Sequence, residues 1–277
     1  MNKELTEMAT YEANIVDYGA VGNGVADDTK AFVQAFSAGT GCVVVPKGTY
    51  KITSTITIPD SYILKGIGSL SYILKGFNGD MVRMENGSQI TQLTLEGNGK
   101  TYTGRGIIIE SGSGQKIADI TIKNTAGYCI EYTAPSVGMI STIDKCNLGT
   151  LNKEQLPAIK YPMDSPSGGD RKVTTVDCGG GLLADFAGCS TTLVSNCNTI
   201  GFIFNPLSRK VSLLGNRIAG GTAKVNLDIY GTNHCVVANT IATPIYLRQG
   251  THHSVVKANI SDGVINQSGN NTNQLDV

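Results

Sequence analysis

From about residue 79 onward, the chain alternates short apolar segments with turns that contain glycine, proline or asparagine. One recurring unit is an alternating strand that ends in Asn or Asp, as in residues 120–124 (ITIKN) and 213–216 (LLGN). The other is a Gly or Pro followed by an apolar triplet, as in residues 106–109 (GIII) and 201–204 (GFIF). Both recur about every 20 to 23 residues, which is typical of a solenoid whose stacked coils bury a shared core.

The residues that end these strands predict a structural ladder at one turn of the coil. Asn tolerates the left-handed backbone of a sharp turn, and its amide can bond to the Asn of the next coil. A role in ligand contact is the alternative. The ladder is expected at Asn98, Asn124, Asn147, Asp177, Asn196, Asn216, Asn239 and Asn259.

The stretch that begins at Asn14, NIVDYGAVGNGVADDTKAFVQAF, has a different pattern. Residues 15–18 predict a short strand, and the three glycines that follow predict tight turns. Asp27 and Asp28 predict the start of a helix, because carboxylates favour a helix N-terminus. From Ala31 the apolar residues follow the i, i+3, i+4 spacing of one buried helix face.

This stretch resembles the opening motif of the pectate lyase superfamily, the single-stranded right-handed parallel β-helices. The resemblance implies an all-β fold, a right-handed parallel β-helix of about 9–10 coils with a short N-terminal capping α-helix. It also implies that Asp27 and Asp28 are structural rather than catalytic. The expected divisions are an N-terminal extension (1–13), the N-terminal strand and capping helix (14–40), the parallel β-helix (41–265) and a polar C-terminal tail (266–277).

The composition excludes several classes of protein and partner. The 277 residues carry 22 basic and 22 acidic side chains, so nucleic acid is not an expected partner. Residues 1–13 contain no apolar segment of a signal peptide, and no apolar run approaches the ~20 residues that cross a bilayer. The 7 cysteines are odd in number and form no CxxC pair, so we expect buried thiols in a reducing compartment and no metal site.

Candidate chemistry comes from the position four residues after each Gly or Pro of the apolar triplets. Equivalent positions of successive coils stack, so Glu110 and Glu131 are expected about 5 Å apart, and Asp185 two coils beyond Glu131 at about 10 Å. A loop rich in proline and glycine, residues 161–170, is expected to overhang this column. The column positions are Arg83, Glu110, Glu131, Tyr161, Asp185, Asn205, Arg248 and Gln267.

The carboxylates of this column and loop are the catalytic candidates, because a stacked carboxylate with a raised pKa can act as a general acid in glycoside cleavage. They are Glu110, Glu131, Asp185, Asp164 and Asp170. The predicted carbohydrate contacts are Tyr161, Asn205, Arg171, Lys172 and Arg248. The alternative is that these positions are polar only because they face solvent.

The resemblance also bears on the type of reaction. No cofactor is expected for a hydrolase, whereas pectate lyase chemistry would use Ca²⁺ with an arginine base. The N-T-D, G-D-D, G-H-G and R-I-K patterns of the pectin hydrolases are absent from the sequence, which argues against a polygalacturonase.

The function that the sequence favours is that of a bacteriophage tailspike or tail-appendage β-helix. Such a protein would be made in the host cytoplasm and carried on the virion, where it binds, and in one version depolymerises, a host cell-surface polysaccharide. The resemblance implies a homotrimer that contacts other virion tail proteins. The alternatives are a free extracellular polysaccharide lyase, glycoside hydrolase or epimerase, and a catalytically inert structural β-helix or adhesin.

Overall fold

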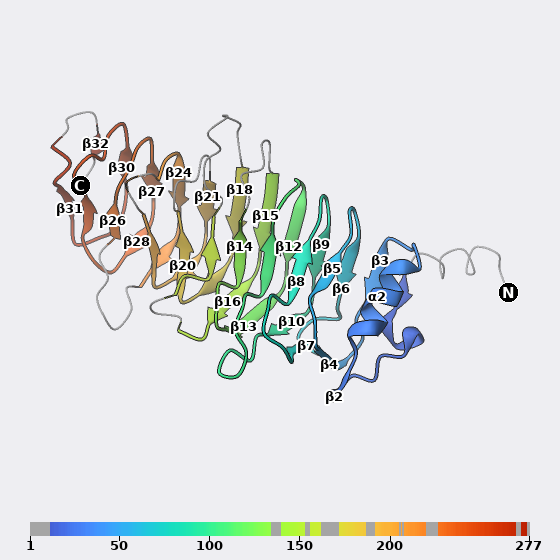
Figure 1. The fold of residues 1–277 in the computed structure, drawn as a ribbon. Coiled ribbons are helices and arrows are strands. Elements are labelled where there is room, and N and C mark those ends of the chain that lie inside the picture. Colours follow the sequence, from blue (N-terminus) through green and yellow to red (C-terminus); the bar gives the residue numbers. More distant parts are fainter. Residues whose placement is uncertain are drawn as a thin grey trace.

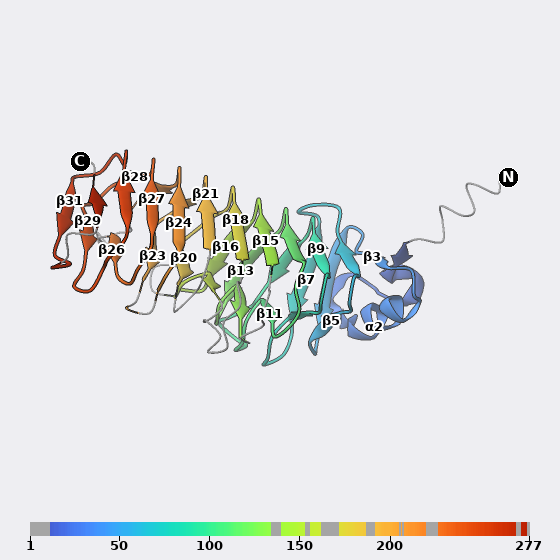
Figure 2. The same cartoon turned by 90° about the horizontal axis from the view of Figure 1, so that it is seen from above.

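The alternating apolar positions form parallel strands that stack coil upon coil along one axis (Figures 1 and 2). The computed structural model describes residues 12–133, 140–152, 156–161, 172–186, 192–204, 206, 208–219, 227–269 and 273–275. It is an all-parallel β-solenoid of about nine turns with one short α-helix, which confirms the predicted fold class. Among the described residues, no helix is long and apolar enough to cross a membrane.

Each full coil contributes one strand to each of three parallel sheets, here named A, B and C in the order in which the chain visits them. Sheet A contains β1 (Ala13–Asn14), β3 (Cys42–Val44), β6 (Ile63–Lys65), β9 (Gln89–Thr91), β12 (Gln115–Ala118), β15 (Ile140–Asp144), β18 (Lys172–Val176), β21 (Thr192–Ser195), β24 (Val211–Leu214), β27 (Cys235–Val237), β30 (Val255–Lys257) and β32 (Gln274–Leu275). Sheet B contains β2 (Asn23–Asp27), β4 (Gly48–Ile52), β7 (Ser71–Lys75), β10 (Thr94–Glu96), β13 (Thr121–Thr125), β16 (Asn147–Thr150), β19 (Gly179–Gly180), β22 (Asn198–Thr199), β25 (Arg217–Ile218) and β28 (Thr240–Ile241).

Sheet C holds the strands that carry the candidate site. It contains β5 (Ile56–Ile58), β8 (Val82–Met84), β11 (Ile107–Ile109), β14 (Ile130–Tyr132), β17 (Ile159–Lys160), β20 (Leu182–Asp185) and β23 (Gly201–Ile203). A three-stranded sheet D takes the place of sheet C in the last coils, with β26 (Leu227–Ile229), β29 (Ile245–Leu247) and β31 (Val264–Asn266). The strand ladder continues past residue 265, because β32 pairs with β30 within the segment expected to be a polar tail.

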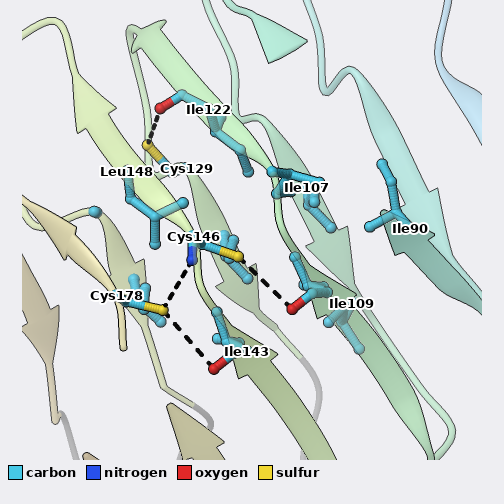
Figure 3. Packing of buried hydrophobic residues seen from close by; sticks show 14 of the residues in the cluster. Ile90, Ile107, Ile109, Ile122, Cys129, Ile143, Cys146, Leu148 and Cys178 are labelled. Carbon is cyan, nitrogen blue, oxygen red and sulfur yellow. Dashed lines mark hydrogen bonds between the residues drawn. The ribbon is translucent and has the colours of Figure 1, made fainter. Parts of the chain in front are cut away.

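The core runs the length of the solenoid, because the in-register pairing of the coils keeps their apolar positions aligned. Ile90 of sheet A, Ile107 of sheet C and Leu148 of sheet B are fully buried and point into the same interior (Figure 3). Six cysteines are described and all are free, and burial raises the pKa of the Cys129 thiol to about 12. The prediction that buried cysteines act as small apolar residues is therefore confirmed for Cys129 and its buried neighbours.

The first coil is closed by the predicted helix, α2 (Thr29–Ser37). Its Phe32 is fully buried and meets the ring of Tyr50 edge to face, with 6.3 Å between centroids. The strand predicted over residues 15–18 is wrong: this segment is the 3-10 helix η1 (Ile15–Tyr18). The side chain of Asn14 accepts a hydrogen bond from the Val16 N–H, which favours a helical turn over an extended segment.

Asp27 and Asp28 both hold the cap in place. Oδ1 of Asp28 accepts a hydrogen bond from the Val21 N–H at 2.6 Å, which fixes the glycine-rich turn. Oδ2 of Asp27 accepts from the Thr53 hydroxyl at 2.6 Å, which ties the start of α2 to the first coil. The two carboxylates therefore have the structural contacts that the motif implied.

The predicted ladder forms at its last three positions. The side-chain amide of Asn216 donates to Oδ1 of Asn239 at 3.0 Å, and that of Asn239 donates to Oδ1 of Asn259 at 2.9 Å. Asn216 and Asn239 are buried at the turn between sheets A and B. The residue before each ladder position, such as Ala238 with φ 56°, has the left-handed backbone.

In the preceding coils the ladder position is occupied by cysteine, which corrects the prediction for Asn147 and Asn196. Both of these asparagines are exposed, and the buried positions are Cys146, Cys178 and Cys197. The backbone N–H groups of Cys146 and Cys178 each donate to the sulfur of the next coil at 3.4 Å. The ladder thus lies one residue away from the predicted register in these coils.

Candidate functional site

The outer face of sheet C carries a row of side chains, one from each of five successive coils, which we call the sheet C row. The row is defined by the strand registers, in which Arg83 pairs with Ile108, Ile108 with Glu131, Glu131 with Lys160, and Lys160 with Asp185. These positions alternate along each strand with core positions such as Ile130 and Ile159 and therefore point outward, although Ile108 and Glu131 are themselves buried. The sheet C row is Arg83, Ile108, Glu131, Lys160 and Asp185.

This register corrects the predicted carboxylate column at Glu110. The Gly127 N–H donates to the Gly104 carbonyl at 2.9 Å, so Gly127 is aligned with Gly104 and not with Gly106. Glu110 therefore lies two residues past the position equivalent to Glu131. It is half-exposed and forms an ion pair with Arg83, with 2.7 Å between Nη1 and Oε2.

Tyr161 is one residue past the sheet C row and lies inside the solenoid. It is fully buried, and its ring stacks on Phe186 with 5.2 Å between centroids. Its hydroxyl lies 2.6 Å from the hydroxyl oxygen of Thr175, and burial raises the pKa of Tyr161 well above its ordinary value. The prediction that Tyr161 contacts a carbohydrate is wrong, because a slip of one residue moves a strand side chain to the opposite face.

Glu131 is the most enclosed charged side chain of the sheet C row, with 9% of its side chain exposed. Its Oε2 accepts a hydrogen bond from Arg105 at 2.8 Å, and its Oε1 accepts one from Lys160 at 2.9 Å. Arg105 also forms a two-pronged pair with Asp80, at 2.8 and 2.7 Å. Both oxygens of Glu131 are therefore engaged by cations, which explains how a carboxylate is tolerated at this depth.

These pairs stabilise the charged forms of the basic side chains. The hydrogen bonds of Arg105 to Asp80 raise its pKa above the ordinary value, and its hydrogen bond to Glu131 raises the pKa further. The hydrogen bond to Glu131 raises the pKa of Lys160, and the charge of Asp185 acts in the same direction. Asp80, Arg105, Glu131, Lys160 and Asp185 thus form a chain of alternating charges across successive coils.

Tyr128 lies at the edge of this chain of charges. The Lys160 ammonium is 5.5 Å from the centre of the Tyr128 ring, in a cation–π arrangement. Burial raises the pKa of Tyr128, and the nearby charge of Asp185 raises it further. Tyr128 therefore keeps its proton at neutral pH and can donate a hydrogen bond to a ligand on sheet C.

Arg248 directly follows β29 of sheet D and lies at a distance along the axis from Glu131 and Lys160. Its guanidinium donates to Asp228 at 2.6 Å and to Gln267 at 2.7 Å, and it covers the ring of Tyr246 at 4.4 Å. It is part of a separate polar cluster over the last coils. The structure therefore does not bring Arg248 together with the carboxylates of sheet C.

The remaining predicted site residues cannot be placed on the sheet C row. Lys172 is the first residue of β18 in sheet A. The side chain of Lys172 lies outside the described residues, as do Asp164, Asp170, Arg171 and Asn205. Their predicted roles stay predictions.

The prediction from positions four residues after a Gly or Pro did not include three charged residues of the site, Lys160, Arg105 and Asp80. Lys160 could have been found from the strict alternation of buried and outward positions, because it follows the buried Ile159 directly. Arg105 and Asp80 precede their strands, where no periodic signal exists. Among the described residues, no group of three or more His, Cys, Asp or Glu side chains is arranged to hold a metal ion.

Known proteins share parts of this sequence. Residues 13–83 match the family described as rhamnogalacturonase A/epimerase, pectate lyase-like. Over 252 residues the chain is 26% identical to the preneck appendage protein of Bacillus phage PZA, an alignment that covers 82% of this chain and 28% of that protein. A further 115-residue alignment is 30% identical to mannuronan C5-epimerase AlgE4 of Azotobacter vinelandii and covers 33% of this chain and 21% of the epimerase.

Solved structures share the fold along nearly the whole chain. The ORF18 protein of Geobacillus virus E2 superposes with a TM-score of 0.73 at 13% identity, over 98% of this chain and 60% of that one. The A-module of the Azotobacter vinelandii epimerase AlgE6 superposes with a TM-score of 0.52 at 17% identity, over 95% of this chain and 98% of that one. The resemblance drawn from the N-terminal motif is confirmed by the family match over residues 13–83, and the chain has the parallel β-helix fold that the Geobacillus virus E2 protein shares.

Proposed function

We propose that the chain is the β-helical part of a bacteriophage tail appendage, carried on the virion, and that it binds a polysaccharide of the host cell surface. The observation that carries the appendage role is the similarity to the PZA preneck appendage protein over 252 residues. Because the chain spans 28% of that relative, the partners of the whole protein are part of the proposal. They are two further copies of the chain in a homotrimer and other tail proteins of the virion.

The glycan-binding surface that we propose is the sheet C row with the side chains beside it. Three cations and four carboxylates face one another there, so the surface has almost no net charge. They are Arg83, Arg105, Lys160, Asp80, Glu110, Glu131 and Asp185. A polyuronate would have to compete with these carboxylates for each cation, whereas a neutral or amino-sugar polymer can add hydrogen bonds at the edges of the existing pairs.

Depolymerisation is a second candidate function, supported by Tyr128 and its neighbours. The Tyr128 hydroxyl, beside Lys160, would donate a hydrogen bond to a leaving oxygen, while its raised pKa makes it a weak acid, so the proton itself would come from a carboxyl group. The carboxylates that we propose for such chemistry are Asp185 and the half-exposed Glu110, together with the predicted Asp164 and Asp170. Glu131 is less suited, because catalysis would have to break one of its two ion pairs. If depolymerisation proceeds by a lyase reaction and not by hydrolysis, it would use Ca²⁺.

The test is an incubation of the purified chain with envelope polysaccharide from the phage-susceptible host. Retention of the chain on immobilised polysaccharide and release of new reducing ends or unsaturated ends are measured in parallel. We expect retention that falls in Asp185→Asn and in Lys160→Met but not in Asn198→Ala, whose side chain is exposed on sheet B. Absence of retention for the unmodified chain would overturn the glycan-binding proposal.

Product release separates binding from cleavage. Release that is lost in Asp185→Asn would establish depolymerisation, and retention without release would leave receptor binding alone. Light scattering at micromolar concentration tests assembly, and a monomer there contradicts the proposed homotrimer.

A further inference from the structure

A polar cavity lies on sheet B, away from the sheet C row. Its volume is about 300 Å³, and it is lined by Glu96, Asn98, Gly99, Lys100, Asn124 and Leu151. Glu96 ends β10 and Asn124 lies in β13, so the floor comes from two adjacent coils. None of the predicted site residues contributes to it. We call this the sheet B cavity.

The carboxylate of Glu96 is held in one orientation. Its Oε1 accepts hydrogen bonds from the Asn98 N–H at 3.2 Å and from the Asn124 side-chain amide at 3.0 Å. Lys123 lies 3.7 Å from its Oε2, and 18% of the Glu96 side chain is exposed. The group is therefore pre-oriented, partly neutralised and still accessible from the cavity.

Asn98 and Asn124 present further acceptors. Both have left-handed backbone conformations, with φ of 47° and 55°, at the same end of sheet B. The amide nitrogen of Asn124 is directed to Glu96, and that of Asn98 lies 3.5 Å from the Lys75 carbonyl. Within the described part of the chain, neither Oδ1 accepts a hydrogen bond, so each is available to a donor from a ligand.

The walls of the cavity are fixed by backbone contacts. The Gly99 N–H donates to the Asn124 carbonyl at 2.7 Å, and a Cβ at Gly99 would lie 2.6 Å from that same oxygen. Only glycine allows this close approach, which sets the distance of the loop from the next coil. On the opposite side, the Leu151 N–H donates to the Thr125 carbonyl at 2.8 Å, and 43% of Leu151 is exposed. Leu151 thus gives the cavity one apolar wall.

We propose that the sheet B cavity binds a single uncharged sugar unit of pyranose size. Neighbouring hydroxyl groups of the sugar donate to Glu96 and to the free carboxamide oxygens, and its C–H face packs on Leu151. Charged ligands fit less well, because Lys100 and Lys123 repel an ammonium group, and a carboxylate has no proton to donate to Glu96 or to the two carboxamide oxygens. The volume lies at the small end of ligand pockets and suits one ring.

This assignment goes beyond the proposed function, because it concerns a different sheet and does not require that the sheet C row binds anything. If the sheet B cavity and the sheet C row engage the same glycan, their joint effect is avidity, which can exceed either affinity without any further contact.

The experiment uses ligand-observed NMR with the purified chain and four separate probes: glucose, galactose, N-acetylglucosamine and glucuronate. We expect saturation transfer to at least one of the three neutral sugars, and less to glucuronate. Glu96→Gln and Asn124→Gly should each weaken that binding about tenfold, the effect of about 1.4 kcal/mol. Asn124→Gly removes the side chain while keeping a residue that adopts the left-handed backbone.

Two matched controls make the test specific. Asn196→Gly removes an exposed asparagine that has the same backbone conformation, with φ 54°, at another turn. Glu85→Gln neutralises a carboxylate outside the cavity. Both should bind the neutral sugar as the unmodified chain does.

The proposal is overturned if none of the neutral sugars binds, or if Glu96→Gln and Asn124→Gly bind as well as the controls. Thermal unfolding first shows whether each variant is folded. If Asn124→Gly does not fold, Leu151→Ser, a substitution at an exposed position in the cavity wall, replaces it as the variant that should weaken sugar binding. Since the probes are monosaccharides, this result is separate from retention on host polysaccharide, which tests the proposed function.

Discussion

Glu131 and Lys160 lie on adjacent strands of sheet C, and the Lys160 ammonium donates to Oε1 of Glu131 at 2.9 Å. Arg105 engages the other oxygen, so the carboxylate is enclosed by two cations. The residues that the sequence suggested as a set of stacked catalytic carboxylates are therefore interrupted by basic side chains. This pairing makes the centre of the outer face rigid and leaves Asp185, Tyr128 and Glu110 at its margins.

Loss of a cation at Glu131 should destabilise the fold. Arg105→Met removes both guanidinium hydrogen bonds from Asp80, which keeps the backbone N–H of residue 105, and leaves one oxygen of Glu131 without its partner. We therefore expect the free energy of unfolding to fall by about 2 kcal/mol. Urea unfolding followed by circular dichroism measures it. Arg83→Met is the matched control, because the Arg83–Glu110 pair is half-exposed and should contribute about 0–1 kcal/mol. Equal effects of the two substitutions would contradict the structural role of the Glu131 pairs.

The asparagine ladder should be sensitive to a single deletion. Oδ1 of Asn239 accepts from both the backbone and the side chain of Asn216, so Asn239→Ala leaves buried donors without partners. We expect a loss of about 2–3 kcal/mol in the free energy of unfolding. The exposed Asn198 provides a control, because Asn198→Ala should change the free energy of unfolding by about 0.5 kcal/mol or less. A ladder that contributes nothing would give the same midpoint for both variants in urea.

Acid should weaken the protein through His234. This side chain is 2% exposed, its Nδ1 lies 3.3 Å from the Val211 nitrogen, and its Nε2 lies 2.8 Å from the Tyr230 carbonyl oxygen. Burial lowers the pKa of His234 to about 4, so between about pH 6.5 and pH 4 the unfolded chain binds a proton that the folded chain does not. Stability is therefore present above pH 6.5 and is lost as the pH falls toward 4, by about 3 kcal/mol in total.

The measurement for His234 is the urea midpoint at pH 7.5 and pH 5.0. His234→Gln should reduce the difference between the two midpoints, even though it lowers stability at both pH values. His252→Gln changes an imidazole of intermediate exposure and serves as the control. A pH dependence that is unchanged in His234→Gln would show that other groups cause it.

The N-terminal cap offers a pair of neighbouring residues with opposite exposure. Phe32 is fully buried against Tyr50, whereas 54% of Val33 is exposed. Phe32→Ala should cost about 3–5 kcal/mol through the cavity that it opens, and Val33→Ala about 0.5 kcal/mol. Soluble yield and thermal unfolding measure the difference. Similar behaviour of the two variants would mean that α2 does not close the first coil.

The fold could be predicted because its signals are local and repeated. The apolar triplets and the turn residues recur with the coils, and the aspartates of the cap precede a short amphipathic helix. The ladder at Asn216 and Asn239 was also visible, since asparagine recurs there at coil spacing. Where cysteine replaces asparagine, as at Cys178, no polar signal marks the same position.

The site was harder to predict, because it depends on the register between coils. Gly104 and Gly106 are equally plausible partners for Gly127 in the sequence, and only the hydrogen bond between Gly127 and Gly104 decides. A one-residue difference separates Lys160, which faces outward, from Tyr161, which lies in the core. Ion pairs across coils follow from that register and have no sequence pattern of their own.

The turn between sheets A and B changes its chemistry along the axis, from Ile120 through the cysteines Cys146 and Cys178 to Asn216 and Asn239. Apolar contacts hold its first coils and amide hydrogen bonds hold its last ones. The stabilisation that comes from apolar burial weakens on cooling, whereas a buried hydrogen bond between side-chain amides does not depend on apolar burial. These two parts of the solenoid are therefore expected to differ in temperature response, with amide protection factors falling on cooling near Ile120 before they fall near Asn239.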